Sequence, residues 1–159
     1  MIDHALIARD AVNLLDSMSV SSGKPVLLVG DDADRRSVMD AIRDASGATP
    51  INLNIELSQA LVNATATVVD IAAVIWALVP SSRILLLDRI QLLMLPQLRI
   101  NALDVLCRVA RRRVLCASWP GRLDHSRLRY ANPDHPECVD EDASRALVLD
   151  MSINESIHR

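Results

Sequence analysis

Five short apolar runs, each followed by a polar or small residue, constrain the fold of this 159-residue chain more than any other feature. Four of the runs are apolar almost throughout, residues 51–55 alternate between apolar and polar residues, and stretches with helical spacing separate the runs. This pattern is typical of a parallel sheet that has helices on both faces. The expected strands cover residues 25–29, 51–55, 83–88, 114–118 and 146–149. The sequence therefore predicts a three-layer α/β fold with a five-stranded parallel sheet.

The remaining segments complete one domain, which the length of the chain also favours. Apolar residues at helical spacing predict helices over residues 2–18, 34–46, 58–63, 68–79 and 98–111. Residues 1–24 then form an N-terminal helix and a linker, and residues 152–159 form a polar tail. Residues 119–145 contain three prolines and most of the local charge, which predicts a long loop segment.

Composition excludes several classes of protein. The formal net charge is −3 and the chain has two Trp, one Tyr and no Phe, so neither bulk charge nor base stacking predicts a nucleic-acid binder. Direct DNA contact through arginine-rich segments stays open. The longest nearly uncharged run, residues 68–79, is too short to span a membrane, and no signal peptide is present, so a cytoplasmic protein is expected. Three cysteines without a C-x-x-C spacing predict reduced thiols, with Cys116 in the core.

The first strand is followed by residues with the spacing of a phosphate-binding loop, G-x-x-x-x-G-K-[ST]. Gly30 is the opening glycine, Arg36 takes the position of the lysine, and Ser37 provides a hydroxyl where magnesium would be held. Arg35 replaces the second glycine, whose missing side chain lets the backbone approach phosphates. Three aspartates in the same segment oppose a polyanion. The segment therefore predicts a degenerate nucleotide site that binds Mg-ATP weakly.

Two further strand ends complete this hypothesis. Asp88 ends the third strand, where phosphate-loop proteins place an aspartate that orders the magnesium shell. Arg89 follows it, in place of the glutamate that many hydrolytic versions use to activate water. Ser118 ends the fourth strand, where these folds often place a residue that senses the γ-phosphate. These substitutions predict weak or no ATP hydrolysis. An aspartate at a strand end is equally typical of a turn or cap, so that alternative stays open.

Two groups of arginines have two interpretations each. Arg122, Arg127 and Arg129 lie in the long segment before the last strand, where oligomeric ATPases present an arginine to a neighbour's nucleotide. A solvated loop explains them as well. Residues 111–113 are three consecutive arginines at the end of a predicted helix, where cations stabilise the negative end of the helix dipole.

Several strings carry a resemblance to a known family. They are residues 52–54, 57–61, 85–93, 104–106, 112–121 and, as the most specific, the Tyr-Ala-Asn-Pro-Asp-His-Pro-Glu string 130–137. Over about residues 25–150 the chain resembles the BrxF family, the small P-loop proteins of type 3 BREX phage-defence systems. The resemblance implies a cytoplasmic, ATPase-like subunit of a bacterial antiviral complex that also contains a larger ATPase, a methyltransferase and a phosphatase-like subunit.

The resemblance further implies an AAA+-like P-loop core without a helical lid. Such a core cannot close its own site, which predicts a homo-oligomer or a stable complex with the larger ATPase. Gly30, Ser37 and Asp88 match the family by position, whereas Arg35 and Arg36 depart from an intact phosphate loop. The prolines of residues 130–137 predict a rigid loop that serves as an interface.

Two alternatives belong to other classes of protein. In a pseudo-receiver, Asp31 and Asp32 would bind magnesium, Asp88 would accept a phosphoryl group and Ser118 would supply the switch hydroxyl. The single lysine, Lys24, lies before the first strand, although a receiver needs one after the fifth. The other alternative is a scaffold without a ligand, since 50% of the residues are hydrophobic and excess apolar surface favours a partner.

Overall fold

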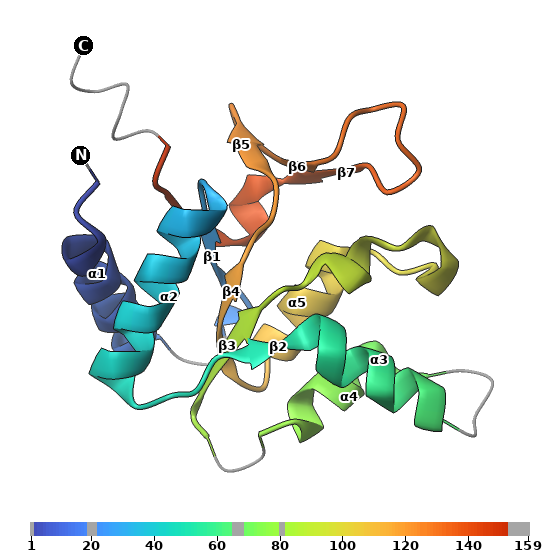
Figure 1. Cartoon of the computed structure of the whole chain (residues 1–159), viewed down its shortest axis with the longest axis horizontal. Helices are drawn as coiled ribbons and strands as arrows, with labels where there is room; N and C mark the ends of the chain where they lie inside the picture. Colours follow the sequence, from blue (N-terminus) through green and yellow to red (C-terminus); the bar gives the residue numbers. More distant parts are fainter. Residues whose placement is uncertain (1, 19–21, 65–68, 80–81, 153–159) are drawn as a thin grey trace.

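Five parallel strands form the central sheet of the computed structural model, which describes residues 2–18, 22–64, 69–79 and 82–152 (Figure 1). The strands are β1 Val26–Val29, β2 Ile51–Asn52, β3 Ile84–Asp88, β4 Val114–Ser118 and β8 Leu147–Asp150. Their order across the sheet is β2-β3-β4-β1-β8, and all neighbours pair in parallel. The predicted α/β class and five-stranded parallel sheet are confirmed.

Successive residues of each strand point to opposite sides, so apolar strands place apolar side chains on both faces of the sheet. Helices cover both of these faces. Leu28, Leu86 and Cys116 pack with α1 His4–Ser17 and α2 Asp32–Ser46. Leu27 and Leu87 point the other way and pack with the second group of helices. This group consists of α3 Leu53–Asn63, α4 Ile71–Ala77 and α5 Ala102–Ala110 (Figure 1). Strands that are buried on both faces explain why most of the runs are apolar almost throughout.

The second strand is shorter than predicted. Residues 51–55 alternate like a strand, but only Ile51–Asn52 pair with β3, and α3 begins at Leu53. Asn52 Oδ1 accepts a hydrogen bond from Ile55 N at 3.2 Å, which caps the helix. Leu53 and Leu57 are fully buried four residues apart, as one face of a helix requires. The predicted helix over residues 58–63 is therefore the second half of α3.

The two following helices also begin later than predicted. Asp70 caps α4 at Ile71, and residue 68, the first of the predicted range 68–79, lies outside the described residues. The helix predicted from residue 98 begins at Ala102, because Asn101 Oδ1 caps it through Asp104 N at 2.9 Å. Two short 3-10 helices, Gln91–Met94 and Pro96–Leu98, fill the chain between β3 and this cap.

The segment predicted as a long loop, residues 119–145, contains a second sheet, and residues 131–138 between two of its strands are a loop. β5 Arg122–Asp124, β6 Arg127–Tyr130 and β7 Val139–Asp142 pair antiparallel, and a 3-10 helix, Ala143–Arg145, leads to β8. Its apolar side faces the core, where Leu128 is fully buried. Trp119 is buried beneath it and donates its indole N–H to Arg129 O at 3.1 Å. A three-stranded sheet becomes stable because one face packs on a core. The tail from residue 153 lies outside the described residues.

The three cysteines differ in burial, and this difference predicts their reactivity. Cys116 is fully buried, and this raises the pKa of its thiol to about 12. Burial also raises the pKa of Cys107, whereas Cys138 is exposed. Since the thiolate is the reacting species, a disulfide reagent at pH 8 should modify one thiol rapidly in the native protein and all three in denaturant. Counting the thiol groups that react with and without urea tests this. Equal reaction rates of the three thiols in the native protein would contradict the burial of Cys116 in β4.

Candidate functional site

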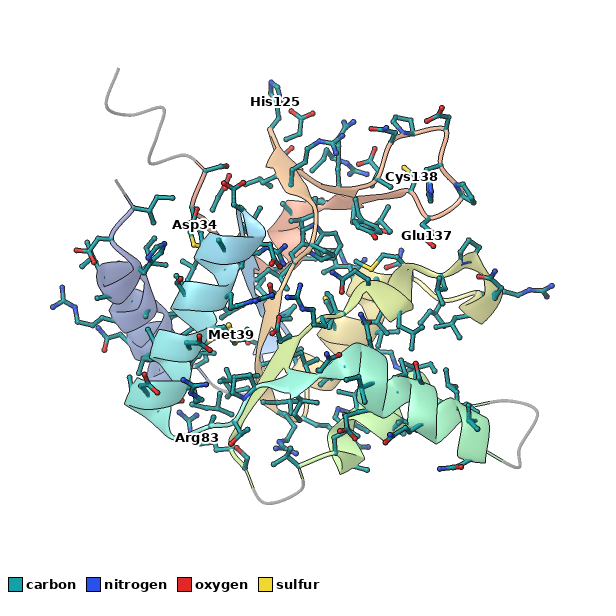
Figure 2. The ribbon with its side chains drawn as sticks, viewed as in Figure 1. Asp34, Met39, Arg83, His125, Glu137 and Cys138 are labelled. Atoms are coloured by element: carbon teal, nitrogen blue, oxygen red, sulfur yellow. The ribbon has the colours of Figure 1, made fainter. Side chains whose placement is uncertain are left out.

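The carboxyl ends of β1, β3 and β4 meet at one edge of the sheet, where ligands bind in this class of fold. Gly30 follows β1, Asp88 ends β3, and Ser118 ends β4. The first turns of α2 lie over this edge, with Asp34 toward this end of the helix and Met39 further along it (Figure 2). The structure therefore brings together these three predicted site residues with the start of α2.

The connection from β1 to α2 contains two residues. β1 ends at Val29, and α2 begins at Asp32 with Asp31 as its N-cap, two residues earlier than predicted. Most of the segment that matches the phosphate-loop spacing is therefore helix. Arg36 and Ser37 are exposed on α2. A phosphate cradle is built from successive N–H groups of a loop, and this short connection does not form one of the usual length.

Gly30 has a structural requirement of its own. Its φ of +147° lies in a region that residues with a side chain rarely adopt. A Cβ added there would lie 3.0 Å from the Cβ of Met151, which follows β8. The close approach of β1 and the end of β8 thus accounts for a glycine at this position without any ligand.

Arg35 fills the space between the ends of β1 and β4. Its side chain points back from α2 and only 7% of the residue is exposed. Nε donates to Gly30 O at 3.0 Å, and Nη1 donates to Ser118 Oγ at 2.6 Å. Burial lowers the pKa of Arg35, while the carboxylates of Asp32 and Asp88 act in the opposite direction. The guanidinium remains charged, because its pKa starts far above neutral pH.

Two of the three aspartates of this segment, Asp32 and Asp34, have side-chain partners. Asp32 Oδ1 accepts from Arg89 Nη1 at 2.8 Å, and its Oδ2 lies 3.3 Å from Arg36 Nη2. Asp34 Oδ1 lies 2.7 Å from His4 Nε2, which joins the starts of α1 and α2. Asp32 is therefore part of a local network with two arginines, one of which follows β3, whereas Asp34 contacts α1.

The surroundings of Asp88 fit both interpretations that the sequence left open, a turn residue and a site residue. Its Oδ1 accepts from Arg89 N at 3.0 Å, as a turn-stabilising aspartate does. Arg89 adopts a left-handed conformation, with φ of +54°, and its carbonyl accepts from Asn54 N at 2.9 Å. Burial is the main cause that raises the pKa of Asp88, and the nearby charge of Asp32 adds to it. A half-buried carboxylate with a raised pKa beside a strained backbone is typical of functional sites.

Ser37 and Asp88 are the residues that would hold the magnesium of a bound nucleotide; Ser37 lies on α2 and Asp88 ends β3. Among the described residues, no group of three or more His, Cys, Asp or Glu side chains is placed to hold a metal ion.

The three arginines proposed to act on a neighbouring subunit lie on the antiparallel sheet. Arg122 pairs in register with Arg129, and both point to the charged face of that sheet. Arg127 Nε donates to Asp140 Oδ1 at 2.8 Å, which lowers the pKa of that carboxyl. Arg129 Nε lies 3.7 Å from Asp124 Oδ2. Arg127 and Arg129 are thus engaged within their own chain, whereas Arg122 is exposed and has no ion pair in the described part of the chain.

Sequence reasoning missed the roles of Arg35 and Arg89. In the phosphate-loop hypothesis Arg35 takes the place of a glycine, but it shares one face of α2 with Val38, Met39 and Ile42. This 35-38-39-42 spacing is the signal that could have placed it on the buried side of a helix. The hydrogen bond between Arg89 and Asp32 joins residues 57 positions apart, so only the tertiary structure shows it.

Comparisons with protein-family models, with curated protein sequences and with solved structures each find no match to this chain. Among the described residues, no helix combines the length and the apolar character needed to cross a membrane.

Proposed function

We propose that this chain is a P-loop-like subunit of a BREX-type phage-defence complex whose nucleotide site has become structural. The observation that carries the proposal is the buried Arg35 guanidinium, which is bonded to Gly30 O and Ser118 Oγ. In a working site these strand ends would face the phosphates of ATP. Here a cation supplied by the chain itself takes that position. The subunit then acts through assembly, with weak or no ATP hydrolysis.

The strand order supports a P-loop-like core over the receiver alternative. In receivers, which are flavodoxin-like, the order is 2-1-3-4-5, so the first strand lies next to the third. Here β1 lies between β4 and β8, and β3 pairs with β2 and β4. The first strand between the fourth and fifth, with the second at an edge, is the order of AAA+ cores. The resemblance to the BrxF family points to the same fold.

The partners follow from the resemblance and from the site. A core whose site lacks the usual loop depends on other subunits for any nucleotide chemistry. We expect a homo-oligomer, or a complex with the larger BREX ATPase or the methyltransferase. The β6–β7 loop carries the most specific string of the resemblance, residues 130–137, and is mostly exposed, as an interface requires.

Calorimetric titration with Mg-ATP tests the proposal. The wild-type protein should show no saturable binding tighter than about 1 mM, because Arg35 and the short β1–α2 connection leave no phosphate cradle. The double variant Arg35→Gly with Arg36→Lys should not gain tight binding either, since the helix still begins at Asp32. Arg36→Lys alone is the matched control, because Arg36 is exposed.

Micromolar binding of Mg-ATP by the wild-type protein would overturn the structural role. Saturable binding of beryllium fluoride in magnesium without ATP binding would favour the receiver alternative. Co-expression with the larger ATPase of a type 3 BREX system tests the assembly role, and a strict monomer that does not co-purify with it contradicts that role.

A further inference from the structure

Cations gather at the opposite edge of the parallel sheet, where the strands begin. Ile84 pairs in register with Val114, so the preceding residues, Arg83 and Arg113, are neighbours across β3 and β4. Lys24 lies two residues before β1, which pairs with β4 on its other side. Arg83 lies at the lower edge of Figure 2, far from His125 on the β5–β6 connection. This edge is the end of the molecule opposite the Arg35 site.

Contacts with Trp76 hold two arginines at this edge, Arg112 and Arg113, in place. The Arg112 guanidinium carbon lies 4.2 Å from the centre of the Trp76 ring. Arg113 Nη1 donates to Trp76 O at 3.2 Å. The Trp76 indole N–H in turn donates to Val109 O at 3.3 Å, near the end of α5. Arg112 is therefore preorganised by stacking, which leaves the N–H groups along the edge of its guanidinium available for a ligand.

The end of α5 does not use these side chains as caps. Arg111 N donates to Arg108 O, and the backbone N–H groups of Arg112 and Arg113 donate to Val109 O, each at 3.0 Å. The last carbonyls of the helix are thus satisfied by the backbone. One or two cations would be enough to stabilise the negative end of the helix dipole. The number of cations at this edge therefore exceeds what the end of this helix requires.

The local charge is strongly positive although the chain is acidic. Arg83 pairs with Asp16 and Arg108 pairs with Asp70, while no carboxylate among the described residues forms an ion pair with the other four cations. These four are Lys24, Arg111, Arg112 and Arg113. The first three are exposed, whereas Nε and Nη2 of Arg113 are buried and have no hydrogen-bond partner among the described residues. We name the three exposed residues, Lys24, Arg111 and Arg112, the basic edge; the whole chain, by contrast, has a net charge of −3.

We propose that the basic edge binds the phosphodiester backbone of duplex nucleic acid. Guanidinium groups match phosphate oxygens in a bidentate manner, and Arg112 is already held in a fixed plane. A single strand would require exposed aromatic rings for base stacking. Arg112 covers the face of Trp76 instead, so the surface offers charge without a stacking platform. This inference does not depend on the state of the Arg35 site.

Fluorescence anisotropy with a 20-base-pair DNA duplex, and separately with an RNA duplex of the same length, tests the proposal. With about three phosphates neutralised, raising salt from 50 to 200 mM should weaken binding roughly 40-fold. The variant Lys24→Gln, Arg111→Gln, Arg112→Gln should bind at least about tenfold more weakly at 50 mM salt, and the slope of log affinity against log salt should fall from about −2.7 to near zero. Arg113 is left unchanged because its contact with Trp76 O is structural.

The control variant Arg9→Gln, Arg99→Gln, Arg122→Gln removes three exposed arginines elsewhere and should bind like the wild type. A second variant, Lys24→Gln with Arg111→Gln, preserves the stacking of Arg112 and should lose an intermediate share of the affinity. Absence of duplex binding at 50 mM salt overturns the proposal. Equal loss in the basic-edge and control variants also overturns it, as does binding of an acidic polypeptide such as polyglutamate with an affinity equal to that for both duplexes.

Discussion

Replacing Arg35 by alanine is expected to lower the free energy of unfolding by about 3 kcal/mol. The substitution removes a buried donor from Gly30 O and from Ser118 Oγ, and leaves both acceptors without this partner. It also removes packing by the aliphatic part of a side chain on the inner face of α2. Urea denaturation followed by circular dichroism measures the change.

The neighbouring arginine supplies the control for this prediction. Arg36 is exposed and pairs with Asp32 on the helix surface, so Arg36→Ala should cost no more than about 0.5 kcal/mol. A double-mutant cycle with Ser118→Ala should show a coupling of at least about 1 kcal/mol, because the two side chains share a buried hydrogen bond. Equal costs for the two arginines would show that Arg35 is not part of the folded core.

Replacing Gly121 by alanine is expected to disrupt the antiparallel sheet, with a cost of about 3 kcal/mol. A Cβ at this position would lie 1.7 Å from Arg129 O and 2.9 Å from Trp119 Nε1. The first distance is far below contact, so β5 would have to move away from β6 and the bond between Trp119 and Arg129 would be lost. Hydrogen exchange should rise in β5–β7 and stay low in β1 and β4.

Gly47→Ala is the matched control for this substitution. Gly47 ends α2 with φ of +76° and has no atom within 4 Å of an added Cβ. Its replacement should cost about 1 kcal/mol through backbone conformation, without a local rise in exchange in β5–β7. If Gly121→Ala has the stability and the exchange pattern of the wild type, the close contact between β5 and β6 does not exist in solution.

The inner strands β1, β3 and β4 were predictable because most of their residues are buried on both faces of the sheet. Full burial on two sides demands an uninterrupted apolar run, and β4 matches its predicted range, residues 114–118. The predicted range of the second strand, residues 51–55, was wrong because Asn52 can either continue a strand or cap a helix. The burial of Leu53 and Leu57 on one helix face favours the helix cap. The antiparallel sheet was missed because its short strands show their alternation only once a core supplies the second face.

The sequence by itself determined the fold class and the polar residues at the strand ends. Only the tertiary structure decided that α2 begins directly after β1 and that Arg35 turns inward to Ser118, 83 residues away. It also decided that cations from separate segments meet at one edge of the sheet. The physical reason is the same in each case. Local spacing specifies which face of an element is apolar, whereas the partner of a buried charge is specified by the packing of elements that are distant in the chain.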